Sequence, residues 1–136
     1  MTPKNRPSGP KIQRKKILIV DDDPSIREIL ATQMGRLNYD TITAADGREA
    51  LAQFKAEKPD LIIMDVMMPV LDGLAACKAI RALEKDCRTP VLFLTAREAQ
   101  QDKLISALSG GDDFVSKPIS LQELHERVDA ALAKKK

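Results

Sequence analysis

Short apolar runs recur along the chain, and segments long enough for a helix separate each run from the next. Such runs predict the strands of a parallel sheet that is buried on both faces. Tyr39–Thr43 is a more polar run and predicts a strand at the edge of that sheet. The other four runs end on charged or hydroxyl residues: Ile17–Val20 leads into Asp21–Asp23, Leu61–Met64 into Asp65, Val91–Leu94 into Thr95, and Phe114–Ser116 into Lys117 and Pro118.

Helix signals fall between these runs. Four helix starts are marked, at Asp23-Pro24, Asp46-Gly47, Asp72-Gly73 and the capping box Ser120–Glu123. The first helix should stop near Asn38, and a further helix is expected at residues 98–109, closed by Gly110 and Gly111. The inward-facing residues are expected to be Ile26, Ile29, Leu30 and Met34 in the first helix, Ala50, Leu51 and Phe54 in the second, Leu74, Cys77, Ile80 and Leu83 in the third, and Leu124, Val128 and Leu132 in the fifth.

The alternation of strands and helices indicates an α/β fold. Five strand–helix units imply right-handed crossovers and a three-layer sandwich. We expect residues 16–133 of the 136 to form this single domain. Residues 1–15 have no periodicity and several prolines, which predicts a disordered N-terminal arm, and residues 134–136 form a short C-terminal tail.

The net charge of +2 conceals an uneven distribution. Nine of the 22 basic side chains lie in the first 16 and last three residues, whereas all 20 acidic side chains lie between them. Residues 17–133 therefore carry 13 basic against 20 acidic side chains, a net charge of about −7. An acidic body lies between basic ends, and the N-terminal arm is either a solvated tail or a contact for nucleic acid or an acidic partner.

The sequence does not indicate a membrane protein or a protein that binds metal through cysteines. No apolar run approaches the ~20 residues of a membrane span, and the N-terminus lacks the apolar stretch of a signal peptide. Cys77 and Cys87 have no metal-ligand or redox spacing and are expected to be unpaired thiols of a cytoplasmic protein. His125 is the only histidine, which argues against a histidine-based metal site and favours a solvated helix position.

The polar residues that follow the strands should meet at one edge of the sheet, because ligand sites of parallel sheets lie beyond the carboxyl ends of the strands. Clustered carboxylates repel one another unless a cation is present, and all-oxygen ligands favour Mg²⁺. Asp22 and Asp65, assisted by Asp21, are the candidate ligands, although carboxylates at positions 21 and 22 could simply cap the first helix. Lys117 could pair with a carboxylate or with a phosphoryl oxygen. Thr95 could donate a hydrogen bond to another phosphoryl oxygen.

These motifs resemble the receiver domains of bacterial two-component response regulators over roughly residues 15–133. The resemblance is carried by four motifs in order, namely Val20–Asp23, Asp65–Pro69 followed by Asp72-Gly73, Thr95–Arg97, and Lys117-Pro118. It implies a flavodoxin-like, five-stranded parallel sheet in the order 2-1-3-4-5 with five helices. The nearest type in this family is a stand-alone receiver similar to the chemotaxis response regulator.

The resemblance also implies roles for individual residues. Asp65 corresponds to the phosphoacceptor, and Asp21, Asp22, Asp65 and the carbonyl of Met67 to the ligands of Mg²⁺, with Mn²⁺ as an alternative ion. Thr95 and Lys117 correspond to the residues that contact the phosphoryl group.

Further roles concern switching and lifetime. Thr95 and Phe114 correspond to the switch residues, and Phe114 lacks the hydroxyl of the tyrosine that is common at this position. Met67 and Arg97 correspond to positions that border the path of the attacking water in this family, and they should lengthen the lifetime of the phosphorylated state. The Lys117–Pro118 peptide bond is expected to be cis.

The partners implied by the resemblance are a sensor histidine kinase or histidine phosphotransfer protein, and a downstream protein target. The chain would act as a signalling phosphoprotein in a phosphorelay, assisting its own phosphorylation and dephosphorylation, rather than as an enzyme. We expect no membrane span and no DNA-binding domain, and a receiver excised from a larger regulator is the alternative to a stand-alone protein.

A phosphorylation-linked homodimer is a further hypothesis. Charged residues suit reciprocal ion pairs on the face formed by the fourth helix, fifth strand and fifth helix. Lys103 would pair with Glu123, and Asp113 with Arg127, across the two subunits. Exposed pairs contribute only about 0–1 kcal/mol each, but a two-fold interface repeats each of them.

Two other classes share parts of this pattern. A flavodoxin would need a phosphate loop rich in Ser, Thr and Gly after the first strand, where this chain has three aspartates. A Mg²⁺-dependent aspartyl phosphatase of the haloacid-dehalogenase type would need a second aspartate where this chain has Met67. Both classes therefore fit less well than a receiver.

Overall fold

The computed structural model describes residues 14–66, 68, 71–84, 88–96, 110–117 and 120–134. Within these ranges the elements are β1 (Lys16–Val20), α1 (Pro24–Arg36), β2 (Asp40–Ala44), α2 (Gly47–Glu57), β3 (Leu61–Asp65), α3 (Gly73–Leu83), β4 (Val91–Ala96), β5 (Asp113–Lys117) and α5 (Leu121–Lys134). The helix expected at residues 98–109 lies outside the described residues, as do the N-terminal arm up to residue 13 and residues 135–136.

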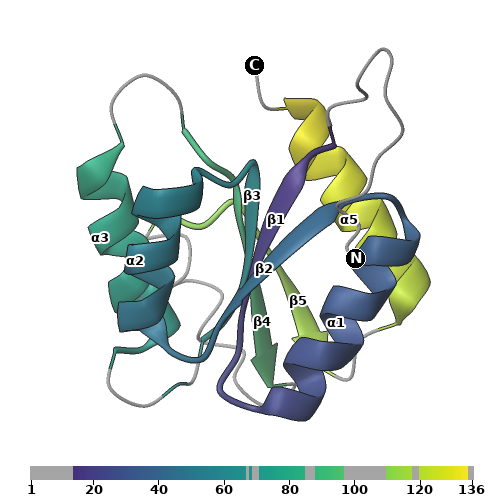
Figure 1. The fold of residues 1–136 in the computed structure, drawn as a ribbon, viewed down its shortest axis with the longest axis horizontal. Helices are drawn as coiled ribbons and strands as arrows, with labels where there is room; N and C mark the ends of the chain where they lie inside the picture. Colours follow the sequence, from purple (N-terminus) through teal and green to yellow (C-terminus); the bar gives the residue numbers. More distant parts are fainter. Residues whose placement is uncertain are drawn as a thin grey trace.

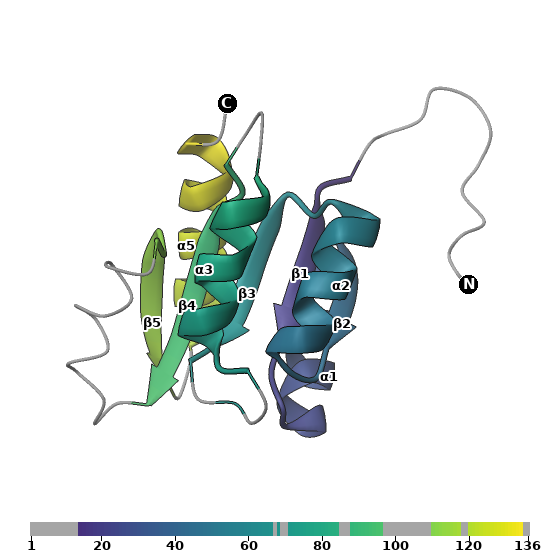
Figure 2. The same cartoon turned by 90° about the vertical axis from the view of Figure 1, so that its left-hand side faces the viewer.

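The five strands form one parallel sheet in the order β2-β1-β3-β4-β5, which confirms the predicted fold class. Helices α1 and α5 lie on one side of the sheet and α2 and α3 on the other, as Figure 1 shows. Figure 2, a view turned by 90°, shows that the strands run in the same direction and that their arrowheads share one end of the sheet. The three-layer arrangement buries both faces of the sheet, which explains why its strands are apolar at successive positions.

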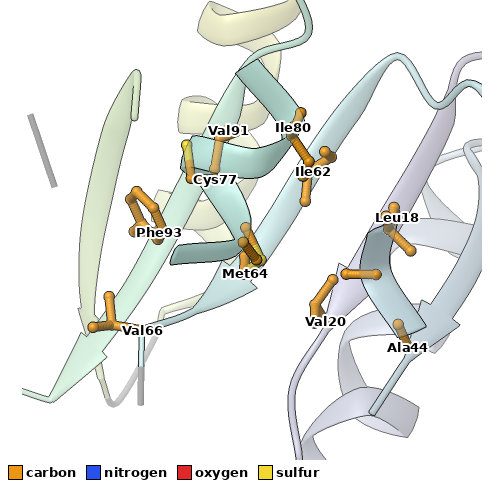
Figure 3. Packing of buried hydrophobic residues seen from close by; sticks show 12 residues of the cluster. Leu18, Val20, Ala44, Ile62, Met64, Val66, Cys77, Ile80, Val91 and Phe93 are labelled. Atoms are coloured by element: carbon orange, nitrogen blue, oxygen red, sulfur yellow. The ribbon is translucent and has the colours of Figure 1, made fainter. Parts of the chain in front are cut away.

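Successive residues of each strand pack on opposite faces of the sheet. On one face, Leu18 and Val20 join Ile62, Met64 and Phe93 in a core with α2 and α3 (Figure 3). On the other face the alternate strand residues pack with α1 and α5; this second core consists of Ile17, Ile19, Leu30, Met34, Leu61, Ile63, Leu92, Leu94, Val115, Leu124 and Val128.

All four marked helix starts are confirmed by hydrogen bonds. The carboxylate of Asp23 accepts from the amide of Ser25 at 2.9 Å, and the equivalent bonds at α2 and α3 are 2.8 Å. At α5, the hydroxyl oxygen of Ser120 accepts from the amide of Glu123 at 3.0 Å. These side chains satisfy amides that the helices cannot pair internally, so the starts are set by local sequence.

Two apolar residues do not lie where their spacing predicted. Ile29 is 52% exposed and Leu83 is 40% exposed, whereas Leu30 and Met34 are buried. On α1 the buried stripe runs at i, i+4 through Ile26, Leu30 and Met34, and Ile29 is turned about 100° away from Leu30 on the same helix. Leu83 is the last residue of α3, where the helix leaves the sheet.

Strand β2 begins one residue later than predicted, at Asp40. The amide of Tyr39 instead donates to the carbonyl of Met34 at 3.1 Å, which closes the C-terminal end of α1. Its hydroxyl donates to a carboxylate oxygen of Asp129 on α5 at 2.8 Å. Tyr39 therefore belongs to the turn that ends α1 rather than to the strand.

Candidate functional site

Three carboxylates meet beyond the ends of β1 and β3. One ligand oxygen each from Asp21, Asp22 and Asp65 lies within 4.8 Å of the others. Asp21 is 1% exposed and Asp65 is 6% exposed, whereas Asp22 is open to solvent. The sheet order reverses between β1 and β3, and such a reversal is the usual place for a ligand site in a parallel sheet. The sequence prediction that these three residues gather at one edge is confirmed.

The turn from β1 into α1 holds the first two carboxylates in place. The amide of Asp21 donates to the carbonyl of Ala44 at 3.2 Å, which extends the pairing of β1 with β2 by one residue. Beyond that point, Asp21 Oδ1 accepts from the amide of Asp23 at 2.9 Å. The N-cap of α1 is Asp23, so capping of that helix does not account for the positions of Asp21 and Asp22.

Arg27 is a residue of this site that the sequence did not single out. Its guanidinium Nη1 donates to the backbone carbonyl of Asp21 at 2.7 Å, six residues earlier in the chain. The bond fixes the turn and adds a positive charge next to the acidic cluster. An arginine one turn into a helix that follows an acidic run is the signal that could have found it.

Asp65 is the last residue of β3, and a compact turn follows it. The amide of Val66 donates to the carbonyl of Leu94 at 3.0 Å, and the carbonyl of Val66 accepts from the amide of Gly73 at 3.0 Å. A Cβ atom at Gly73 would overlap the carbonyl oxygen of Asp65 and lie 3.1 Å from the Cα atom of Val66. Gly73 is therefore required for space beside the strand end, and not only to open α3.

The strand register brings Thr95 and Lys117 to the same end of the sheet. On β4, Leu94 pairs with Asp65, Thr95 one position further pairs with Ser116, and Ala96 two positions further pairs with Lys117. The side chains of Thr95, Lys117 and Phe114 lie outside what the structure describes, as do Met67, Arg97, Lys103 and Pro118 entirely. Their predicted roles, and the cis bond before Pro118, stay predictions.

Three of the four charged residues predicted to pair between subunits, Asp113, Glu123 and Arg127, already pair within one chain, and Lys103 lies outside the described residues. Arg127 Nη1 lies 2.6 Å from Asp113 Oδ1, and Arg127 Nη2 lies 3.5 Å from Glu123 Oε2. Helix α5 packs beside the start of β5, so Arg127 can reach both carboxylates without a second subunit. The hydrogen bond to Asp113 raises the pKa of Arg127 above its ordinary value. A dimer that used the predicted pair between Asp113 and Arg127 would have to replace or share this bond.

Cys77 and His125, which the sequence analysis set aside, behave as ordinary structural side chains, and Cys87 lies outside the described residues. Cys77 is a buried free thiol of α3, and burial raises its pKa. His125 lies partly exposed on α5, with Nε2 3.3 Å from Asp129 Oδ2. Among the described helices, none combines the length and the apolar character needed to cross a bilayer.

Comparison with known proteins agrees with this geometry. A family model described as the response regulator receiver domain matches residues 17–129. Among curated proteins, the alkaline phosphatase synthesis transcriptional regulatory protein PhoP of Bacillus subtilis is 47% identical over 118 residues, which cover 87% of this chain and 48% of that protein. The chain therefore spans about half the length of the curated relatives it matches.

Two solved structures show the same fold over nearly their whole length. The receiver domain of sensor histidine kinase PA1611 from Pseudomonas aeruginosa, solved with a magnesium ion in its active-site cleft, is 31% identical with a TM-score of 0.82, covering 90% of this chain and 100% of that one. Chemotaxis protein CheY4 of Vibrio cholerae is 33% identical with a TM-score of 0.79, covering 88% and 99%. With its parallel sheet, its acidic cluster at the ends of β1 and β3, and a family match over most of its length, the chain belongs to the response regulator receiver domain family.

Proposed function

We propose that this receiver is a phosphoacceptor, in which Asp65 takes a phosphoryl group from a histidine kinase or a histidine phosphotransfer protein in the presence of Mg²⁺. The observation that carries the proposal is the cluster of three carboxylates, two of them almost inaccessible to water. Buried carboxylates without a cation repel one another, so their concentration at one sheet edge favours a site for a cation and a phosphoryl group. The magnesium ion in the similar receiver of Pseudomonas aeruginosa supports the same conclusion.

The donor set fits Mg²⁺, and Mn²⁺ as an alternative. All three side chains offer carboxylate oxygens, which are the ligands that hard divalent cations prefer. Asp21, Asp22 and Asp65 would hold the ion, together with the backbone carbonyl of Met67. When bound, the ion supplies positive charge that offsets the negative charge of the carboxylates and of an incoming phosphoryl group.

The transfer itself needs one nucleophile on the chain. A carboxylate oxygen of Asp65 forms a bond to phosphorus while the bond from phosphorus to the donor breaks, either to the imidazole nitrogen of phosphohistidine or to the carboxyl oxygen of an acyl phosphate. The leaving group keeps the electron pair, and the product is an aspartyl phosphate. The Lys117 ammonium and the Thr95 hydroxyl would contact the phosphoryl oxygens, so the chain assists a transfer onto itself and is not a turnover enzyme.

The readout of phosphorylation belongs to the same proposal. Thr95 would move toward the phosphoryl group, and Phe114 would turn inward with it. Thr95 belongs to β4 and Phe114 to β5, which are neighbours in the sheet, and α5 contacts β5, so the surface of β5 and α5 would change and alter the binding of a downstream protein target. This mechanism makes the chain a signalling phosphoprotein of a cytoplasmic phosphorelay.

A second candidate is a receiver excised from a larger regulator with an output domain. The similarity to transcriptional regulators of about twice the matched length supports this candidate. Immunodetection of the natural protein in its own cells distinguishes the two. A polypeptide of about 136 residues supports the stand-alone receiver, and one of about twice that length supports the larger regulator.

The phosphoacceptor role is tested by incubating the protein with Mg²⁺ and acetyl phosphate and measuring its intact mass. We expect one phosphoryl adduct, which persists as a protein species and is lost in Asp65→Asn or when Mg²⁺ is chelated. Asp23→Asn is the matched control, because asparagine caps a helix about as well as aspartate and this substitution also removes one acid from the turn. An adduct that survives in Asp65→Asn would refute the assignment, and continuous turnover without an adduct would indicate a phosphatase.

A further inference from the structure

We propose that Gly47 is a positioning residue for the metal site, although it contributes no ligand. Gly47 is the first residue of α2, the helix that follows β2, and β2 lies across β1 from β3 in the sheet. The inference rests on the proposed binding of Mg²⁺ and adds to it a determinant of affinity outside the acidic cluster.

The close approach of two segments requires the glycine. The amide of Gly47 donates to the carbonyl of Leu71 at 3.1 Å. A Cβ atom at position 47 would overlap that carbonyl oxygen and lie 2.9 Å from the Cβ atom of Leu71. Among the described glycines only Gly110 has a positive φ, so Gly47 is needed for space and not for an unusual backbone conformation.

Leu71 lies two residues before Gly73, the first residue of α3. The amide of Gly73 donates to the carbonyl of Val66 at 3.0 Å, and Val66 directly follows Asp65. Leu71 is therefore attached on one side to the start of α2 and on the other, through Asp72 and Gly73, to the strand end that carries Asp65.

The same short stretch of chain also contacts the other half of the acidic cluster. The carbonyl of Ala44, three residues before Gly47, accepts from the amide of Asp21. Between these two contacts the backbone is held by reciprocal caps: Asp46 Oδ1 accepts from the amide of Glu49 at 2.8 Å, and Glu49 Oε1 accepts from the amide of Ala45 at 2.7 Å. Residues 44–47 thus form a rigid link between the Asp21 turn and the segment after Asp65.

If residues 44–47 are displaced, the distance between the turn that holds Asp21 and the strand end that carries Asp65 should change. In Gly47→Ala the new methyl group meets backbone atoms of Leu71, which cannot move aside as a flexible side chain would. Leu71 and the start of α3 must then shift relative to α2, and the carboxylates of Asp21 and Asp65 lose their relative placement. Residues that orient metal ligands typically change affinity by 10–100-fold when replaced, so we expect the dissociation constant for Mg²⁺ to rise about tenfold.

Isothermal titration calorimetry with MgCl₂ on the full chain measures this effect. Gly35→Ala is the matched control, because a Cβ atom at Gly35 on α1 would meet nothing within 4 Å. The wild-type protein and Gly35→Ala should bind Mg²⁺ equally, and Gly47→Ala should bind it about tenfold more weakly while its circular dichroism stays native. Equal dissociation constants for all three proteins would overturn the inference and leave the proposed function intact.

A measurement on the wild-type protein decides the matter if Gly47→Ala does not fold. Hydrogen exchange of the Gly47 amide, followed by NMR, reports the opening of its bond to Leu71. Saturating Mg²⁺ should slow this exchange several-fold, because binding at the carboxylates would restrain Asp65 and, through the bond between Gly73 and Val66, also Leu71. Unchanged exchange at Gly47, while the amides of Asp21 and Asp65 shift, would overturn the inference. A wild-type protein that binds no Mg²⁺ would overturn the proposed metal role, and the inference with it.

Discussion

Replacing Arg81 with methionine should be one of the most destabilising changes on the surface of this protein. Arg81 lies in the last turn of α3, and its side chain is only 17% exposed. Its Nη1 donates to the carboxylate of Glu84 at 2.8 Å and to the carbonyl of Thr89 at 2.7 Å. Its Nη2 donates to Asp112 Oδ2 at 2.9 Å, and both Nε and Nη2 donate to the carbonyl of Gly110. One guanidinium thus joins α3 to the segments that precede β4 and β5.

The magnitude follows from what each partner keeps after the substitution. Thr89 is buried, and a buried acceptor that loses its donor costs about 1–3 kcal/mol. Glu84 and Asp112 keep other donors, the amides of Thr89 at 2.6 Å and Val91 at 2.8 Å, so the two lost ion pairs add only about 1 kcal/mol together. Methionine retains most of the apolar contact of the arginine stem. We therefore expect Arg81→Met to lower the free energy of unfolding by about 2–4 kcal/mol.

Urea unfolding followed by circular dichroism measures this free energy by linear extrapolation. Arg88→Met is the matched control, since Arg88 also contacts Asp112 and the carbonyl of Gly110 but is 52% exposed. Exposed pairs contribute about 0–1 kcal/mol, so this variant should differ little from the wild-type protein. If Arg81→Met were no less stable than Arg88→Met, the contacts of Arg81 would not carry the stability assigned to them.

Three further predictions concern pH, phosphoryl lifetime and assembly. Burial and the hydrogen bond to Asp129 raise the pKa of Tyr39 to about 12, so this bond stabilises the fold fully below pH 10 and is lost as the pH rises toward 12. Because the chain has one tyrosine and no tryptophan, tyrosinate absorbance measures this directly, and a midpoint near 10 in the folded protein would contradict it. Replacing Met67 and Arg97 together with small polar residues should shorten the lifetime of the phosphoryl adduct, as followed by intact mass; an unchanged decay would make them ordinary surface residues. Phosphorylation-linked dimerisation predicts a concentration-dependent dimer in sedimentation velocity only with a stable phosphoryl mimic, and a monomer in both states would show that Arg127 serves its own chain.

The sequence-based predictions that the structure confirms depend on residues that are close together in the chain. A strand buried on both faces must be apolar at successive positions, and Ile17–Val20 and Leu61–Met64 meet that requirement without reference to other segments. Helix caps are equally local, since Asp23 and Ser120 bond to amides two or three residues later. The acidic site could be placed because Asp65 ends a strand, and parallel strands end at the same edge.

Contacts between segments that are far apart in the chain have no comparable signal in the sequence. The spacing of apolar residues on α1 allowed Ile29 to face inward, but the packing of α1 against the sheet favours the stripe of Leu30 and Met34 instead. Arg127 was assigned a partner in another subunit because its neighbour on β5 becomes visible only when α5 is docked.

By itself the sequence determined which of the described segments become strands and helices, and that carboxylates gather at one end of the sheet, because both depend on local periodicity and on strand direction. The tertiary structure alone decided how these parts are held. It places Arg27 on the carbonyl of Asp21, Gly47 against Leu71, and Arg81 among three segments. Such contacts depend on the distance between backbones that are far apart in the chain, and that distance is set only when the helices pack on the sheet.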